Sequence, residues 1–157
     1  MATDRRAEVT WHGDLMSGSG RIDSVTSGAI SAATGAFEQL PYSLASRIEK
    51  PDGKTSPEEL LAAAHAACFA MSLASELSSA GKTPEHLDVR ATVTLDEVQD
   101  GSHRIVASKL LARARVKELD QETLETLASS ASDGCPLTKL IEAGAQVTVN
   151  ATLEGDC

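Results

Sequence analysis

The three cysteines, Cys68, Cys135 and Cys157, are the residues of this chain with the most distinctive chemistry. A cysteine sulfur can act as a nucleophile, a redox centre or a metal ligand, and it also packs as a small apolar group. Cys68 follows His65 by three residues in an alanine-rich segment, which places both side chains on one helix face. An imidazole touching the sulfur would favour the thiolate. The alternative is a purely structural pair, with the cysteine packed in the core and the histidine bonded to a backbone carbonyl.

Cys135 stands in the segment DGCPLTK, residues 133–139, which predicts a thiol at the start of a helix because Pro136 suits the first helical position. Free N–H groups and the positive end of the helix dipole stabilise a thiolate there, lowering the thiol pKa below its ordinary value of about 8.5. The alternative is that this sulfur only packs under the turn. A metal site built from His65, Cys68 and Cys135 is a further hypothesis, although no motif fixes its geometry.

Arg47 and Glu58 are charged residues that flank the start of the alanine-rich segment. The default expectation for both is the solvated surface. If Arg47 were buried beside Cys68, however, its guanidinium would stabilise a thiolate and an alkoxide leaving group. A carboxylate would then be needed to hold the guanidinium in place.

A long helix from residue 57 to about residue 80 is the clearest element that the sequence predicts. Ser56 can cap its N-terminus, Pro57 suits its first position, and Glu59 completes a capping box. Gly81 supplies a C-terminal stop. Alanine and leucine occupy all faces of this helix, so we expect it to be buried nearly all round.

The remaining elements cluster by type, which favours an α+β fold with a mostly antiparallel sheet and a single domain over residues 1–157. Alternation of apolar and polar residues predicts strands, and three- to four-residue spacing predicts helices. The expected strands cover residues 7–11, 21–25, 41–48, 87–98, 103–116 and 146–153; the expected helices cover residues 119–132 and 134–144, and residues 26–37 are expected to form a loop or a single helical turn.

Composition narrows the choice of partners. The 14 lysines and arginines against 23 aspartates and glutamates give a net charge of −9, and aromatic residues make up only 3% of the chain. Both facts argue against nucleic acid and anionic membranes as partners. The apolar stretch over residues 60–74 is expected to be too short and too polar to span a bilayer. With no apolar run of signal-peptide length after the start, we expect a cytoplasmic protein.

The two cysteine motifs resemble those of a known family. Residues 55–71, TSPEELLAAAHAACFAM, and residues 133–139, DGCPLTK, closely resemble the two cysteine motifs of the OsmC/Ohr family of peroxide-reducing proteins. Residues 9–14 and 42–47 look like the first strands of that family, and the His-Ala-Ala-Cys pattern is closer to its OsmC branch. The similarity spans almost the whole chain, but residues 32–39 look longer than is typical, and Cys157 has no counterpart.

This resemblance implies an OsmC-like fold, in which an intertwined homodimer packs its sheets around long, buried central helices. It implies thiol-dependent reduction of organic hydroperoxides, with an external dithiol, for example a lipoylated protein, as the reductant and with no metal or other cofactor. Cys68 matches the attacking cysteine, Cys135 the resolving cysteine, Arg47 the activating arginine and Glu58 the carboxylate that positions it. The helix-start position alone would make Cys135 the more acidic thiol. A small-ligand or redox-sensing module without turnover is the alternative function.

Overall fold

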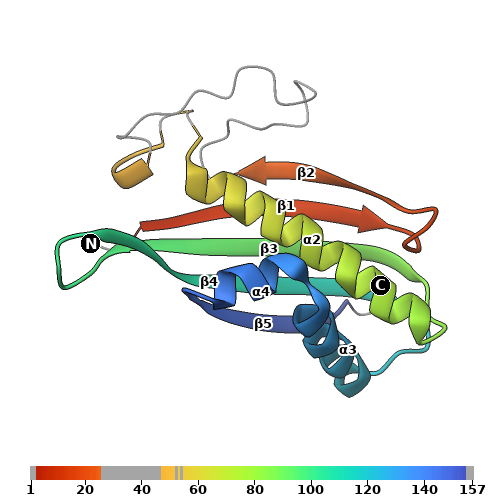
Figure 1. Ribbon diagram of the computed structural model, residues 1–157. Helices are drawn as coiled ribbons and strands as arrows, with labels where there is room; N and C mark the ends of the chain where they lie inside the picture. Colours follow the sequence, from red (N-terminus) through yellow and green to blue (C-terminus); the bar gives the residue numbers. More distant parts are fainter. Residues whose placement is uncertain (1–2, 26–46, 52, 54, 155–157) are drawn as a thin grey trace.

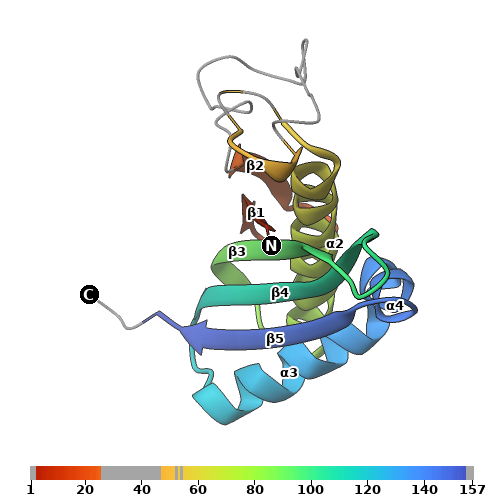
Figure 2. The same ribbon diagram turned by 90° about the vertical axis from the view of Figure 1, so that its left-hand side faces the viewer.

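The computed structural model describes residues 3–25, 47–51, 53 and 55–154. Its described residues contain a five-stranded sheet with the strand order β2-β1-β3-β4-β5. Helix α2 lies across one face of this sheet, and helices α3 and α4 pack beside it near β5 (Figures 1 and 2). The elements are β1 (Thr3–His12), β2 (Ser19–Val25), α2 (Pro57–Ser79), β3 (Pro84–Glu97), β4 (His103–Val116), α3 (Gln121–Gly134), α4 (Pro136–Glu142) and β5 (Gln146–Leu153).

The sheet is antiparallel except at one edge. β1 pairs antiparallel with β2 and β3, and β3 pairs antiparallel with β4. β5 runs parallel to β4, and a parallel pair needs a long crossover connection, which α3 and α4 provide. The expected α+β class and the mostly antiparallel sheet are therefore confirmed.

Small residues let α2 approach the sheet closely. On the inner face of the sheet, Ala7 pairs with Ala91 and Ala112 pairs with Ala151, and all four are buried. α2 meets this face with alanines of its own, so the backbones come together with little side-chain bulk between them. Larger side chains fill the remaining space; Phe69, Leu73, Leu77, Leu87, Leu110 and Leu124 are all fully buried.

The ends of α2 are set by local signals that the sequence predicts. Ser56 Oγ accepts a hydrogen bond from the backbone N–H of Glu59 at 3.3 Å, which caps the first turn. The Glu59 carboxylate is buried and accepts a hydrogen bond from Thr55 Oγ1 at 3.0 Å. Gly81 ends the helix with a φ of +73°, a conformation that favours glycine.

The prediction that α2 is buried nearly all round is wrong for the single chain. Leu60 is 39% exposed and Met71 is 46% exposed, and Ala64 between them is exposed too. We call these three residues the open stripe. Cys68 lies next to the stripe and is half-buried. The sequence could not distinguish a helix buried within one chain from a helix with one uncovered apolar face.

We expected the apolar stretch over residues 60–74 to be too short and too polar to span a bilayer. The whole of α2 is longer than this stretch, and by length and composition alone it could cross a membrane. Half of the most apolar 18-residue segment of α2 is buried inside the domain, as in the core helix of a globular fold.

Most other predicted elements are confirmed, with one correction. Residues 41–48 were expected to form a strand, but Arg47 and Ile48, its described end, are helical. Residues 41–46, the expected loop over residues 26–37, the long segment over residues 32–39 and Cys157 lie outside the described residues.

Candidate functional site

The two internal cysteines meet although 67 residues separate them in the chain. Cys68 Sγ lies 3.2 Å from Cys135 Sγ, a thiol–sulfur hydrogen bond, and both cysteines are free. A disulfide requires about 2.05 Å, so the sulfurs need to close by about 1.2 Å to bond. Cys68 is partly exposed, whereas Cys135 is fully buried behind it.

Cys135 occupies the junction between two helices. It is the C-cap of α3 and the N-cap of α4, with an extended backbone at φ −78° and ψ 117°. Its N–H donates to Ser132 O at 3.1 Å, and its carbonyl accepts from Lys139 N at 3.1 Å. Pro136 begins α4 as the sequence predicts. The sulfur is therefore placed by backbone bonds on both sides of the junction.

The two thiols have pKa values shifted in opposite directions. Burial raises the pKa of the Cys68 thiol, and its hydrogen bond with Cys135 raises it further, against a lowering effect of the Leu137 N–H. Burial also tends to raise the pKa of Cys135, but hydrogen bonds from the backbone N–H of Thr138, from Cys68, from the Thr138 side chain and from the Leu137 N–H outweigh it and leave that pKa lowered. The reduced pair thus favours the thiolate on Cys135, as the helix-start argument predicts.

His65 does not use its ring on the Cys68 sulfur. Its Nδ1 lies 2.8 Å from Ser108 Oγ on β4, and its Nε2 lies 2.9 Å from Thr138 Oγ1 on α4. All three side chains are buried, and burial lowers the pKa of His65 to about 4 against an opposing effect of Glu142. The imidazole is therefore neutral near pH 7 and joins α2 to both of its neighbours.

Both ring nitrogens are thus engaged, which weakens the hypothesis of a metal site with Cys68 and Cys135. Within the part of the chain that the structure describes, no group of three histidines, cysteines, aspartates or glutamates is arranged to hold a metal ion.

Arg47 and Glu58 form an ion pair at the start of α2. Glu58 Oε1 accepts from Arg47 Nη2 at 2.7 Å and from Arg47 Nε at 2.8 Å. The Glu58 side chain is 1% exposed and the Arg47 side chain is 40% exposed. Among the described residues, Glu58 Oε2 is buried without a hydrogen-bond partner. The carboxylate therefore has one cation to balance it and one oxygen left unsatisfied.

The four predicted site residues fall into two pairs rather than one cluster. Glu58 and Cys68 are ten residues apart on α2, which separates their Cα atoms by about 15 Å along the helix axis. Side chains on a helix tilt toward its N-terminus, which directs Glu58 farther from Cys68. The described contacts thus join Cys68 with Cys135 and Arg47 with Glu58, but they do not link the two pairs.

Sequence reasoning missed Ser108 and Thr138, the two hydroxyl residues around His65. Thr138 stands three residues after Cys135, the same spacing as His65 to Cys68, and that matched spacing is the one sequence signal for it. Ser108 is a polar residue at an inward position of β4, where its neighbours Leu110 and Ala112 are apolar. A buried hydroxyl at such a position needs a hydrogen-bond partner.

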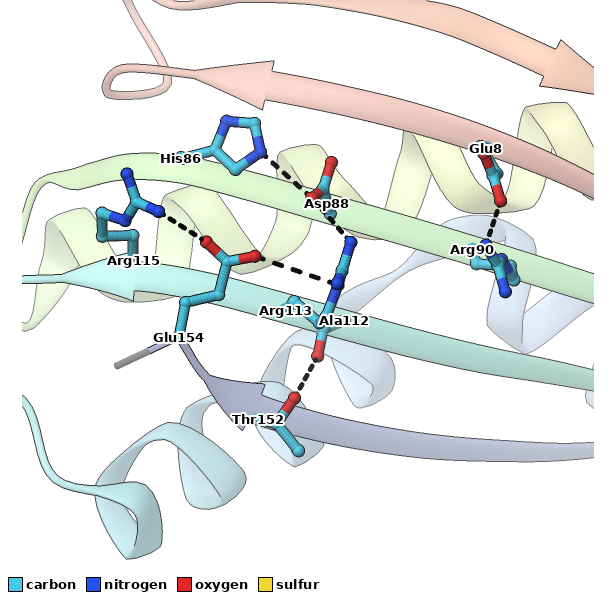
Figure 3. Close-up of polar contacts among 9 residues, drawn as sticks. All are labelled: Glu8, His86, Asp88, Arg90, Ala112, Arg113, Arg115, Thr152 and Glu154. Carbon is cyan, nitrogen blue, oxygen red and sulfur yellow. Dashed lines mark hydrogen bonds and ion pairs between the residues drawn. The ribbon is translucent and has the colours of Figure 1, made fainter. Parts of the chain in front are cut away.

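The opposite face of the sheet carries another concave surface, lined by charged residues of β1, β3 and β4 and by the uncharged Asn150 and Thr152 of β5. Figure 3 shows that these charges balance one another: Arg90 pairs with Glu8, and Asp88 pairs with Arg113, which also faces Glu154 at 3.9 Å. Such exposed pairs are screened by water and contribute little. The thiol pair remains the group with reactive chemistry.

Comparison with known proteins agrees with the cysteine motifs. The family model described as OsmC-like protein matches residues 50–150. The chain is 34% identical to the peroxiredoxin OsmC of Escherichia coli (strain K12) over 154 residues, which covers 98% of this chain and 99% of that protein.

Solved structures share the fold. The organic hydroperoxide resistance protein OhrB of Bacillus subtilis aligns with a TM-score of 0.57 at 24% identity, covering 93% of this chain and 97% of that one. An organic hydroperoxide resistance protein OsmC from Legionella pneumophila aligns with a TM-score of 0.60 at 20% identity, covering 93% and 96%. At these identities the two structures support the fold alone.

Proposed function

This chain belongs to the family of OsmC-like proteins, and from that premise and its thiol pair we propose that it is a thiol peroxidase that reduces organic hydroperoxides to alcohols. The observation that carries the proposal is the 3.2 Å contact between a partly exposed sulfur and a fully buried one. The name of its curated relative supports the same chemistry, since the Escherichia coli protein is a peroxiredoxin.

Accessibility supports Cys68 as the sulfur that attacks the peroxide. A hydroperoxide can approach the partly exposed Cys68, but Cys135 has no exposed surface in the described chain. The Cys68 thiolate attacks the terminal oxygen of ROOH, the O–O bond breaks, and the alkoxide takes up a proton to leave as ROH. Cys68 is left as a sulfenic acid.

Cys135 then closes the cycle. Its thiolate attacks the Cys68 sulfur, the S–S bond forms, the S–O bond breaks, and hydroxide leaves and is protonated to water. Two thiols have lost two electrons and the peroxide has gained them. An external dithiol, for which a lipoylated protein is a candidate, reduces the disulfide by exchange.

The order of the two thiol pKa values means that a proton must move between the sulfurs before this cycle can begin. At rest the anion is favoured on Cys135, whereas attack needs it on Cys68. The sulfurs are hydrogen-bonded, so one proton crossing the 3.2 Å contact converts one state into the other. A cation beside Cys68 would favour the reactive state, and Arg47 is the residue we propose for that role.

Arg47 can reach Cys68 from a second copy of the chain. In such a dimer, the α2 helices of the two copies would cross near Ala64 and run in opposite directions. Glu58 precedes Ala64 and Cys68 follows it, so the first turns of one helix would lie beside Cys68 of the other. Ala64 is small and exposed, and Leu60 and Met71 extend the uncovered apolar surface on either side. We therefore propose a homodimer that buries the open stripe and completes the site with Arg47 and Glu58 of the partner subunit.

An apolar pocket around Cys68, formed where the two copies meet, would favour organic hydroperoxides over hydrogen peroxide. Each methylene that a substrate buries there contributes about 0.8 kcal/mol to binding.

We further propose that residues 1–157 form one domain and that the protein works in the cytoplasm, where thiols are kept reduced.

Variants in which one cysteine is replaced by serine test the proposal. We expect Cys68→Ser to abolish consumption of cumene hydroperoxide and Cys135→Ser to permit one reaction without sustained turnover; Cys157→Ser is the matched control and should turn over like the parent. Mass spectrometry after one equivalent of tert-butyl hydroperoxide should find a crosslink between Cys68 and Cys135. A Cys68→Ser protein with the parental rate would refute the assignment. Stoichiometric oxidation with no steady state on any dithiol would favour the redox-sensing alternative.

A further inference from the structure

β5 is an edge strand of the sheet, so one side of its backbone faces away from β4. In a parallel ladder every second residue bonds to the neighbouring strand, and the residues between them point their N–H and C=O groups the other way. Glu154 N, just after β5, donates to Ala114 O on β4, so the even-numbered residues here face β4. The odd-numbered residues Val147, Val149 and Ala151 therefore present their backbone groups at the outer edge.

The side chain of Gln121, the first residue of α3, occupies part of this edge as a neighbouring strand would. Gln121 Nε2 donates to Ala151 O at 2.7 Å, and Gln121 Oε1 accepts from Leu153 N at 2.9 Å. One residue of a parallel strand placed opposite Thr152 would make the same two bonds. A further bond from Nε2 to Glu125 Oε1 at 2.7 Å fixes the orientation of the amide. The edge is thus closed at the end of β5.

The same pair of bonds can form one step earlier along β5. A strand residue opposite Asn150 would donate to Val149 O and accept from Ala151 N. Within the described residues no strand lies beside these two groups, and no other backbone group outside the sheet bonds to them. Unpaired backbone groups at a strand edge are a template for another extended chain.

A groove of about 670 Å³ gives an extended chain access to these groups. Residues 149–152 of β5 form one wall, and α3, which runs beside β5, forms the other (Figure 2). The side chains that α3 presents in the middle of the groove are small, namely Ala128, Ser129 and Ser132. An added strand therefore meets little side-chain bulk on that wall.

The groove is acidic. The carboxylates of Glu125, Asp133 and Glu142 line it, and Lys139 lies 3.7 Å from Asp133 and 3.5 Å from Glu142. A single ammonium group balances at most one of these carboxylates, so the groove stays negative. A second copy of β5 would bring the same carboxylates with it, and like charges disfavour the pairing of two copies at this edge. A segment that carries lysine or arginine has the complementary charge.

From these contacts we propose that the outer edge of β5 is a docking site for an extended basic segment of another protein, which joins the sheet as a strand parallel to β5. Its main chain bonds to Val149 O and Ala151 N, and its basic side chains face Asp133 and Glu142. Gln121 sets the register, because it occupies the next position along the edge and the segment must turn away there. The inference goes beyond the thiol chemistry and does not depend on it.

Three peptides test the docking site. The probe is a fluorescein-labelled hexapeptide of alternating lysine and valine with capped ends, and its binding to the full chain is followed by fluorescence anisotropy. One control peptide has glutamate in place of lysine, and the other keeps the lysines but is methylated at every peptide nitrogen. We expect saturable binding of the first peptide alone, weakened by added salt. No binding of that peptide, or equal binding of the methylated one, would overturn the proposal.

Paired substitutions test whether the groove itself attracts the peptide. Asp133→Asn/Glu142→Gln removes two carboxylates of the groove and should weaken binding of the lysine peptide several-fold. Glu85→Gln/Glu97→Gln removes two carboxylates from the ends of β3 and should leave the affinity at the parental value. Equal losses in the two variants would mean that the net charge of the chain, rather than the groove, binds the peptide, and would contradict the proposal.

Hydrogen exchange of single amides locates the added strand. Saturating lysine peptide should slow exchange of the Ala151 N–H several-fold and leave the Thr152 N–H, which faces β4, unchanged. In Gln121→Ala the position opposite Thr152 is open, so the peptide should also protect the Leu153 N–H in that variant. Bound peptide without protection of Ala151 would overturn the strand pairing, and a Leu153 amide unprotected in Gln121→Ala would overturn the register.

Discussion

Removing Arg47 should destabilise the protein through the carboxylate it leaves behind. The Glu58 side chain is 1% exposed, and its Oε1 accepts both described bonds from Arg47. Breaking a buried ion pair by deleting one partner costs about 3 to 5 kcal/mol. Arg47 is 40% exposed, so water already screens part of the interaction. We therefore expect Arg47→Ala to lower the free energy of unfolding by about 2 kcal/mol.

Equilibrium urea unfolding, followed by circular dichroism at one fixed protein concentration, measures this effect. With a urea dependence of about 2 kcal/mol per molar, the midpoint should fall by about 1 M. The double variant Arg47→Ala/Glu58→Gln removes the buried charge and should recover about half of the loss. Arg104→Ala is the matched control because Arg104 pairs with Asp100 where both side chains are more than half exposed. It should cost less than about 0.5 kcal/mol.

Two outcomes would refute this reasoning. Equal losses for Arg47→Ala and Arg104→Ala would mean that the burial of Glu58 does not strengthen the pair. A double variant no more stable than Arg47→Ala would mean that the loss comes from other contacts of the arginine rather than from an unbalanced carboxylate.

Three further predictions concern stability. Because burial lowers the pKa of His65 to about 4 in the folded chain, the unfolded chain binds a proton first as pH falls below about 6.5; stability is full above that pH and should drop by about 2 kcal/mol between pH 8 and pH 5, a drop that urea unfolding should find missing in His65→Asn. Gly81→Ala should lower the melting temperature because φ is +73° there, whereas Gly144→Ala, also with free space for a Cβ but without positive φ, should not lower it. Ser56→Ala removes the cap of α2 and should cost about 1 kcal/mol by calorimetry, and an unchanged melting temperature would contradict that role.

The sequence predicted the elements whose signals are local. Both ends of α2 depend on neighbours within a few residues, namely Ser56 with Glu59 and Gly81 with the last turn, so they could be found without the fold. The parallel direction of β5 could not, because alternation marks a strand but not its direction. That direction follows from the crossover through α3 and α4.

The candidate site likewise has features that the sequence could predict and features that it could not. The helix-start position of Cys135 predicted the more acidic thiol, and hydrogen bonds from the first turn of α4 and from Cys68 lower the pKa of Cys135 in the folded chain. The partners of His65 could not be predicted, since Ser108 and Thr138 lie 43 and 73 residues away in the chain. The open face of α2 was missed because composition measures how apolar a helix is, not what covers it.

The crossover that carries Cys135 is anchored at both ends. β4 enters it and β5 leaves it, and the two strands are paired from Ala107 with Gln146 to Ala114 with Leu153. Folding therefore places Cys135 next to Cys68. The two thiols do not have to find each other by diffusion of a flexible chain. Cys135 is held in contact with Cys68, so a Cys68 sulfur that became oxidised would meet Cys135 at a far higher effective concentration than any thiol from solution.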